Sequence, residues 1–492
     1  MTGALTRLES WRLLRHPFVL AGALLSGWLL WDRLGAQLPV LHVLDLATQA
    51  ALVPLAGATL VAANLATLRP KRDHTEDLYA TTPAPPAPRV AAHLLALLPV
   101  TAVAAALVAA VTLRAAGSDY AAGAPSLAEL ALGPAMVLLA GTLGVALGRV
   151  APFAVAGPLA LVAGLLVTMV VFVLGPAISP RLVWLTWLVP DMRPDAPPSG
   201  AVLGRPAGWH LTYVVAMVAG LGALALVRVG ARRWGLATLV AAVAVGIVAG
   251  AAQVVTAPGG AVGDRRVAAA EAGLTRTCAV HEAVTYCAYA GFENRVPLWR
   301  DVVRRARDRV PATAAVVPLE VSQQAQHWDP ASAMVGYDAD IPAGGPVPVP
   351  VGWPTGDGAG AERLRLGIRV AQRTMALPAL DLRDLHGCRP AAGGGVALWL
   401  AAVADPGAVA ALRSDLKDIR DAGAGTLYVH GAHSSLADFD WTRAEAEQAV
   451  ALLDRPEADV RRLVADHWAV LTAPGGTLAQ ASGVLGIPGP TC

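Results

Sequence analysis

Cysteine is absent from the first 277 residues of this 492-residue chain, and charged residues are scarce in its first half. Over the whole chain 15% of the residues are charged and 55% are hydrophobic. This composition excludes an ordinary soluble enzyme, because soluble domains carry about 25% charged residues. All four cysteines lie further on, which favours disulfides and an oxidising compartment for that part. They are Cys278, Cys287, Cys388 and Cys492.

Positive charge is also too sparse for a nucleic-acid-binding protein. Residues 1–255 hold 16 basic and 10 acidic side chains, and the remaining residues hold 22 and 26. The first part is therefore net basic and the second net acidic. Lysine is almost missing, with Lys71 and Lys417 as its two occurrences, so arginine supplies nearly all of the positive charge.

Long apolar runs fill residues 18–255. A run of about 20 apolar residues crosses the hydrocarbon core of a bilayer as a helix. The sequence thus predicts a polytopic α-helical membrane protein with about seven transmembrane helices and a C-terminal extracytoplasmic α+β domain. The expected spans lie near residues 18–31, 47–68, 90–113, 130–148, 151–175, 209–227 and 235–255.

The loops between these spans predict the orientation. With the N-terminus inside, the inner segments carry eleven basic residues and the outer segments before the tail carry five, which the positive-inside rule favours. Seven spans then place the tail outside a plasma (cytoplasmic) membrane, in agreement with the cysteines. The inner residues are Arg7, Arg12, Arg15, Arg69, Lys71, Arg72, Arg89, Arg149, Arg228, Arg232 and Arg233, and the outer ones are Arg33, Arg114, Arg181, Arg193 and Arg205.

Asp, Glu, Lys and Arg are missing from the deep parts of the predicted spans. The polar groups expected there are Gln49, Asn64, His93 and some threonines. Ion-coupled carriers normally place ionisable groups at this depth, so the sequence argues against a secondary transporter or a proton pump. Gln49, Asn64 and His93 are candidates for lining a transport pathway, and equally for hydrogen bonds between helices.

The leader, residues 1–17, is expected to form a cytoplasmic interfacial helix. Leu5, Leu8 and Trp11 fall on one side of such a helix, and arginines fall on the other. The alternative is a basic leader that only orients the first span.

The cytoplasmic loop 69–89 has a mixed charge that favours a second short helix. Thr75 is expected to open it, Asp73 and Glu76 suit its positive N-terminal end, and prolines from Pro83 onward end it. A rigid helix between the second and third spans would offer a cytoplasmic partner a surface to push against. The alternative is a solvated loop that only joins two spans.

The leader, from Leu8-Glu9 to Arg15-His16-Pro17, and segment 72–83 resemble the permease subunits of ABC-2 type transporters. With the order of the spans, the likeness covers roughly residues 1–230. It implies a transmembrane domain that pairs with a second permease copy or paralogue, in contact with membrane lipids, and an ABC ATPase subunit that contacts loop 69–89. The implied coupling residues are Arg72, Thr75, Glu76, Asp77, Leu78 and Pro83. The chain departs from the family by adding a seventh span and a large tail.

A Gly-x-x-x-x-Gly-Lys-Ser/Thr phosphate-binding loop is missing from the whole sequence. We therefore expect ATP hydrolysis on a partner chain, and we expect this subunit to be no enzyme and to hold no cofactor. The predicted function is a permease subunit of an ATP-driven transporter. The alternative is a membrane-anchored extracytoplasmic ligand-binding or sensory protein, or a hydrolase, whose spans serve as a scaffold.

The tail divides into a linker, residues 256–275, and a domain, residues 276–492. Alternating apolar residues between Cys278 and Cys287 predict a small hairpin closed by a disulfide. Four cysteines allow three pairings, and we expect this one, with Cys388 and Cys492 as the second bridge. Strands at 395–403 and 426–430, helices near 408–421 and 442–470, and a surface loop at 341–358 complete the expected α+β domain.

Metal and catalytic motifs in the tail are incomplete. His281 and Glu282 begin a zinc His-Glu-x-x-His pattern, but residue 285 is Thr. His430 and His433 have the spacing of metal ligands, although histidines in a Gly/Ser-rich turn are more often structural. The Gly-x-Ser-x-Gly motif of a hydrolase is absent. The sequence therefore predicts no catalytic residue and no metal.

Overall fold

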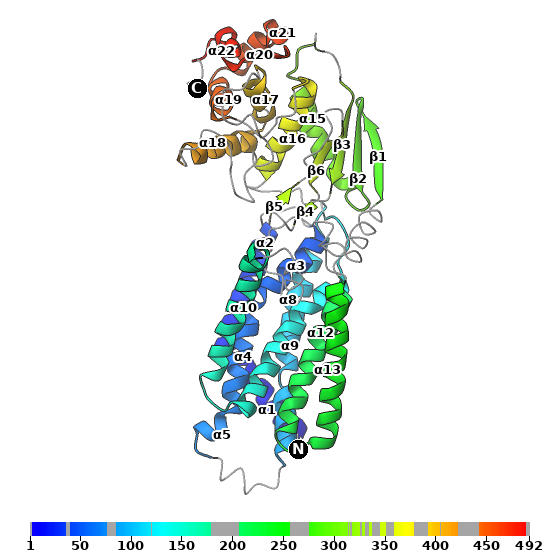
Figure 1. The fold of residues 1–492 in the computed structure, drawn as a ribbon, viewed down its shortest axis with the longest axis vertical. Helices are drawn as coiled ribbons and strands as arrows, with labels where there is room; N and C mark the ends of the chain where they lie inside the picture. The colour runs from blue at the N-terminus through cyan, green and yellow to red at the C-terminus, as the bar shows by residue number, and fades with distance from the viewer. Residues whose placement is uncertain are drawn as a thin grey trace. The chain divides into compact units, whose positions relative to one another are not determined.

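The chain divides into two compact units. The N-terminal unit contains residues 1–34, 39–273 and 328–334, and the C-terminal unit contains the rest. The computed structural model (Figure 1) describes residues 2–35, 40–75, 85–119, 121–178, 206–255, 275–312, 314, 317–324, 327–329, 334–336, 345–350, 359–377, 392–403, 405–421 and 442–488.

Helices make up most of the N-terminal unit. Figure 1 shows them side by side, with α4 and α12 packed against α9 and with α13 packed against α12. They are α1 (Thr2–Leu14), α2 (Pro17–Gly35), α3 (Leu41–Ala51), α4 (Val53–Thr67), α5 (Arg69–Arg72), α7 (Pro86–Leu95), α8 (Leu98–Ala116), α9 (Leu127–Val150), α10 (Ala156–Ile178), α12 (Ala207–Val227) and α13 (Arg232–Val255).

Among the described residues, four helical segments are long and apolar enough to cross a membrane. A fifth is reached if α1 and α2, which are bent by 60° at residues 15–16, count as one span. Residues 53–67 and 156–171 form shorter apolar helices. These lengths are typical of a multi-pass membrane protein. The four segments are Pro86–Ala116, Leu127–Val150, Ala207–Val227 and Arg232–Val255.

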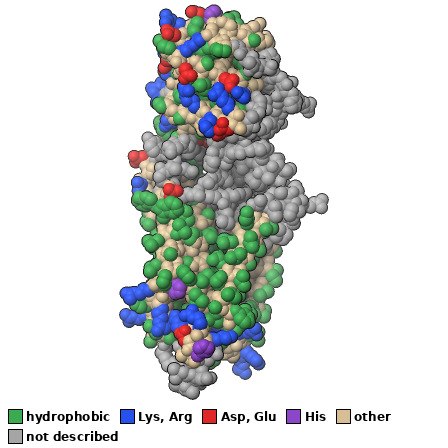
Figure 2. All heavy atoms as spheres, turned by 90° about the vertical axis from the view of Figure 1, so that its left-hand side faces the viewer, with side chains coloured by type: hydrophobic (Ala, Val, Ile, Leu, Met, Phe, Trp, Pro, Cys, Tyr) green, Lys and Arg blue, Asp and Glu red, His purple; other side chains and the backbone are tan. Residues whose placement is uncertain are grey.

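Large apolar side chains are exposed on the outer faces of the bundle, above all on α10 and α13. On the face drawn in Figure 2, green apolar side chains cover the middle of the N-terminal unit, and blue Lys and Arg side chains gather at one end. A soluble protein rarely exposes so much continuous apolar surface, whereas a bilayer would cover it. Examples are Leu159, Leu166 and Met169 on α10, and Val240, Val243 and Ile247 on α13.

Glycines bring α4 and α9 into close contact. A Cβ atom added to Gly144 would overlap the carbonyl oxygen of Leu60 and lie 3.0 Å from the backbone nitrogen of Asn64. One added to Gly148 would lie 2.8 Å from Cβ of Thr67. The two backbones can therefore approach this closely only where α9 carries no side chain.

The C-terminal unit begins with a four-stranded sheet of order β1-β2-β3-β6. The hairpin β1–β2 is antiparallel, and the pairs β2–β3 and β3–β6 are parallel. Glu282 and Ala283 have φ of 51° and 60°, as the two-residue turn of a tight hairpin requires. The strands of this sheet are β1 (Arg276–His281), β2 (Val284–Tyr289), β3 (Leu319–Gln324) and β6 (Val347–Pro350). A separate two-stranded sheet, β4 (His327–Asp329) and β5 (Met334–Gly336), falls in and beside the stretch 328–334 that is assigned to the N-terminal unit.

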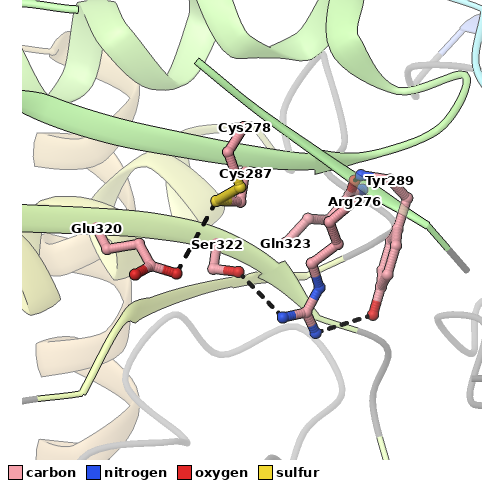
Figure 3. The surroundings of a disulfide bond; sticks show 7 residues. All are labelled: Arg276, Cys278, Cys287, Tyr289, Glu320, Ser322 and Gln323. Atoms are coloured by element: carbon pink, nitrogen blue, oxygen red, sulfur yellow. Dashed lines mark hydrogen bonds between the residues drawn. A yellow bond between two sulfur atoms is a disulfide. The ribbon is translucent and has the colours of Figure 1, made fainter. Parts of the chain in front are cut away.

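A disulfide joins Cys278 and Cys287, which are directly opposite in the hairpin, with Cα atoms 4.1 Å apart. This confirms the expected disulfide-closed hairpin. Figure 3 shows Arg276 beside the bridge, where its guanidinium donates to Ser322 Oγ and to the Tyr289 hydroxyl, each at 3.3 Å. The backbone of the exposed strand β1 thus pairs with β2, and the Arg276 side chain also connects β1 to β3.

Replacing both Cys278 and Cys287 with serine is expected to lower the free energy of unfolding of the C-terminal unit by about 2–3 kcal/mol. The disulfide closes a short loop and so restricts the unfolded chain. Thermal unfolding of the full chain in non-reducing buffer measures the change. Ala279→Ser, on the same exposed strand, serves as the control and should leave the transition where it is. An unchanged transition in the double variant would contradict the prediction.

The other described elements of the C-terminal unit are helices, around a core that includes Leu364, Trp399 and Leu412. Thr442 and Glu445 form a capping box at the start of α19. The helices are η2 (Glu293–Arg295), α15 (Val296–Arg307), α16 (Ala359–Thr374), α17 (Gly394–Ala402), α18 (Pro406–Asp421), α19 (Arg443–Leu453), α20 (Glu457–Asp466), α21 (Trp468–Leu471) and α22 (Leu478–Leu485).

Two expectations for this unit are wrong. The strand expected at 395–403 is the helix α17, all nine residues of which are buried. An apolar run without polar residues has no period that separates a buried helix from a buried strand. In the loop expected at 341–358, residues 347–350 form β6 and pair with β3. The helix expected at 408–421 is confirmed as α18, and that expected at 442–470 is divided into α19, α20 and α21.

Candidate functional site

A buried carboxylate, that of Glu9, connects three elements of the N-terminal unit. Glu9 lies on α1 and is 6% exposed. Arg69 Nη1, at the start of α5, donates to both of its oxygens, at 2.9 and 3.1 Å. Arg12 Nη1 donates to Oε1 at 3.1 Å, and His93 Nδ1, on α7, lies 3.9 Å from Oε2. We call Glu9, Arg12, Arg69 and His93 the Glu9 cluster.

The Glu9 cluster is held together by charge. A carboxylate withdrawn from water is stable only when it is paired and hydrogen-bonded, and the two arginines provide both. Arg149, near the end of α9, lies close enough to His93 for its charge to act on the ring. The cluster therefore fixes the position of α1 against α5 and α7, with the end of α9 close by.

The expected coupling loop, residues 69–89, is described as far as Thr75. The short helix α5 ends at Arg72, and His74 has a φ of 51°, in the left-handed region. The nitrogen of Thr75 then donates to the carbonyl of Pro70 at 2.9 Å, so the chain turns sharply at this point. The side chain of Arg72 is 55% exposed. Thr75 therefore ends a turn, and whether a helix follows it lies beyond the described residues.

The turn between α9 and α10 supports α5. Lys71 Nζ donates to the carbonyl of Pro152 at 3.4 Å and lies 5.9 Å from the ring of Phe153. Two arginines of α5 also act on His16, which lies between α1 and α2. Burial, together with the charges of Arg69 and Arg72, lowers the pKa of His16 below its ordinary value. Burial thus favours the neutral form of His16. The basic groups of several segments thus meet around α5.

The three residues expected to line a pathway are in three different places. His93 belongs to the Glu9 cluster, whereas Gln49, on α3, donates from Nε2 to Glu129 Oε2 at 2.7 Å. Asn64 is fully buried on α4 and donates to the carbonyl of Gly144 on α9 at 3.4 Å. The structure thus brings none of the three together, and Gln49 and Asn64 both make contacts between helices.

Sequence reasoning missed several buried polar residues of the bundle. His210 and Gln253 lie inside two of the predicted spans, with Nδ1 and Oε1 2.7 Å apart, and so connect α12 to α13. Asp45 and Glu129 lie just outside the expected span limits, yet they are 0% and 7% exposed. A hydropathy criterion ends a span at the first charged residue. It therefore assigns a buried carboxylate near a helix end to the loop. The signal that would have found Glu129 is Ser126 three residues before it, the pattern of a helix N-terminus.

Several expected site residues lie outside the described part of the chain. They are Glu76, Asp77, Leu78 and Pro83 of the coupling segment, the cysteines 388 and 492, and the histidines 430 and 433. Within the described ranges, no group of three or more His, Cys, Asp or Glu side chains is arranged to hold a metal ion.

Comparisons with known proteins return nothing for this chain. No protein-family model matches it, and neither a curated protein nor a solved structure does.

Proposed function

We propose that this chain is the membrane permease subunit of an ATP-driven, ABC-type transporter, energised by a separate ATPase subunit that contacts loop 69–89. The Glu9 cluster carries this proposal. A part-buried ion pair, between the buried carboxylate of Glu9 and Arg69, joins helix α1 to the first residue of the loop segment. A force applied to that segment by a cytoplasmic partner would therefore reach α1 through Arg69, and α7 through His93.

The distribution of charge supports a cytoplasmic location for this end of the bundle. The eleven basic residues of the expected inner segments all lie in described parts: on α1 and the turn after it, on α5, in the first turn of α7, at the end of α9, and around the turn between α12 and α13. Positive charge concentrated in this way favours the cytoplasmic side of a membrane. The disulfide of the C-terminal unit supports the opposite, oxidising side for the tail.

The packing of the bundle would pass a displacement of the loop on to the helices inside the bundle. α5 follows α4 with one residue between them, and α4 is in glycine-mediated contact with α9. Helices packed backbone against backbone move as one body more readily than helices separated by flexible side chains. A displacement of α5 would therefore be passed to α9, the helix against which α4 and α12 pack. The partners of this subunit would be the ATPase, a second permease copy or paralogue, and membrane lipids.

A photo-crosslinking amino acid at position 72 tests this proposal. Arg72 is exposed at the start of the loop, so we expect the probe to form a covalent product with an ATP-hydrolysing subunit in native membranes. The matched control is the same probe at the exposed Arg232, in the other basic turn, which should give no such product. If the probes at both positions cross-link only to lipid, or to no protein, the proposal is contradicted. That result would favour the alternative in which the spans are a scaffold.

A further inference from the structure

A second buried carboxylate, that of Asp45, lies in the N-terminal unit beside the beginning of α9, whereas Arg149 is near the end of that helix. Asp45 is on α3, is 0% exposed, and accepts a hydrogen bond at Oδ2 from the nitrogen of Ser126 at 2.6 Å. Its other oxygen, Oδ1, has no hydrogen-bond donor in the described part of the chain. Half of a fully buried carboxyl group is thus left without a partner, which is costly for an ionised group.

Gln49, one helical turn after Asp45, also has a buried oxygen without a hydrogen-bond donor. It is 3% exposed, and its Nε2 is used by Glu129, while its carbonyl oxygen Oε1 accepts no hydrogen bond among the described residues. Residues four apart on a helix share one face, and Asp and Gln at this spacing form hydrogen bonds. Two buried oxygens without a hydrogen-bond donor therefore belong to side chains one turn apart on the same face of α3.

The charges around Asp45 make its ionised form still less favourable. Of the elements that pack against α3, α9 contributes Glu129, whose charge acts on Asp45, and α4 carries no charged residue. α8 contributes Arg114 near its end, and that side chain is exposed. His42 of α3 has a side chain outside the described structure. In contrast to Glu9, Asp45 makes no ion pair with an arginine of the described segments.

We propose that the cluster of Asp45, Gln49 and Glu129 binds one proton at neutral pH, on Oδ1 of Asp45 in the orientation that the structure shows. The proton turns Oδ1 from an acceptor into a donor, and Gln49 Oε1 accepts it. Both unsatisfied oxygens are then satisfied at once, while Ser126 continues to donate to Oδ2.

The proposal does not depend on which way the Gln49 amide is placed. If the amide is turned round, its nitrogen faces the Asp45 side, and its oxygen occupies the position 2.7 Å from Glu129 Oε2. Two oxygens at that distance require a hydrogen between them, so the proton would then be on Glu129. In either orientation the cluster holds one proton, and any opening of this end of the bundle to water would release it. This site goes beyond the proposed permease role and requires no ATPase.

Infrared spectroscopy of the full chain in detergent tests the proposal. Exposed Asp and Glu side chains are ionised at pH 7, because their pKa values are about 4, so they give no carbonyl band of a protonated carboxyl group. We expect the wild-type protein to show such a band at pH 7 and to lose it as the pH is raised. We expect the band to be lost from an Asp45→Asn, Glu129→Gln double variant. The introduced asparagine keeps the shape of Asp45, and its amide can donate to Gln49 in place of the proton.

Two control variants make the result specific. Glu9→Gln removes a buried carboxyl group that lies outside this cluster and accepts hydrogen bonds from two arginines, so the band should remain. His42→Gln should also keep it. A wild-type protein without the band at pH 7 would overturn the proposal, and so would a band that survives in the double variant. A missing band together with a sodium-dependent rise in unfolding temperature, lost in Asp45→Asn, would overturn it in favour of a metal-cation site.

Discussion

Replacing Glu9 with lysine is expected to destabilise the N-terminal unit by about 2–3 kcal/mol. The substitution puts a positive charge in a buried position beside Arg69 and Arg12, where the wild-type protein has the carboxylate that pairs with both. The two arginines are 32% and 48% exposed, so solvent screens part of the repulsion and keeps the effect below that of a fully buried pair. The unfolding temperature of the full chain in detergent measures the change.

A charge swap provides the control for this prediction. The double variant Glu9→Lys, Arg69→Glu restores one ion pair in the reverse direction, and it should recover a large part of the lost stability. A substitution that only removes charge, Glu9→Gln, should have an intermediate effect. Equal unfolding temperatures for the wild type and Glu9→Lys would show that the Glu9 cluster does not hold α1 in place.

Replacing Gly144 with valine is expected to cost about 3 kcal/mol or more and to reduce the yield of folded protein. The new side chain would meet backbone atoms of α4, namely the carbonyl oxygen of Leu60 and the nitrogen of Asn64. Backbone atoms of a packed helix cannot move aside as the end of a side chain can, so the two helices must separate. Separation also lengthens the hydrogen bond from Asn64 to the Gly144 carbonyl.

Gly164 on α10 is the matched control for Gly144. Nothing lies within 4 Å of a Cβ atom added there, so Gly164→Val adds the same side chain without a collision. Size-exclusion chromatography of fluorescently tagged variants in mild detergent compares their folded yields. A monodisperse Gly144→Val protein with the wild-type yield would contradict the close helix contact described above.

The helical bundle could be predicted from the sequence because apolar runs of spanning length have few alternatives. The spacing of Cys278 and Cys287, with alternating residues between them, likewise predicted the disulfide-closed hairpin. The run at 395–403 was misjudged because burial on all sides removes the periodicity that separates helix from strand.

The candidate site was less predictable, because it depends on contacts between distant residues. Glu9 and Arg69 are sixty positions apart, and nothing in the local pattern of either shows that they form an ion pair. Gly144 is one of many glycines in the spans, and only the position of α4 distinguishes it from Gly164. Asp45 and Glu129 fall at the ends of apolar runs, where hydropathy cannot separate a buried carboxylate from a solvated one.

The central claim is that a separate ATPase works on this chain through loop 69–89, and co-purification tests it most directly. The tagged full chain is purified in mild detergent, and its partners are identified by mass spectrometry, beside two charge-reversed variants. One is Arg72→Glu with Glu76→Arg and Asp77→Arg, in the loop, and the other is Arg232→Glu with Arg233→Glu, in the turn between α12 and α13. We predict an ATP-hydrolysing subunit with the wild type and the second variant, and its loss with the first. Absence of any such subunit from the wild-type preparation, or equal recovery with all three proteins, would contradict the account.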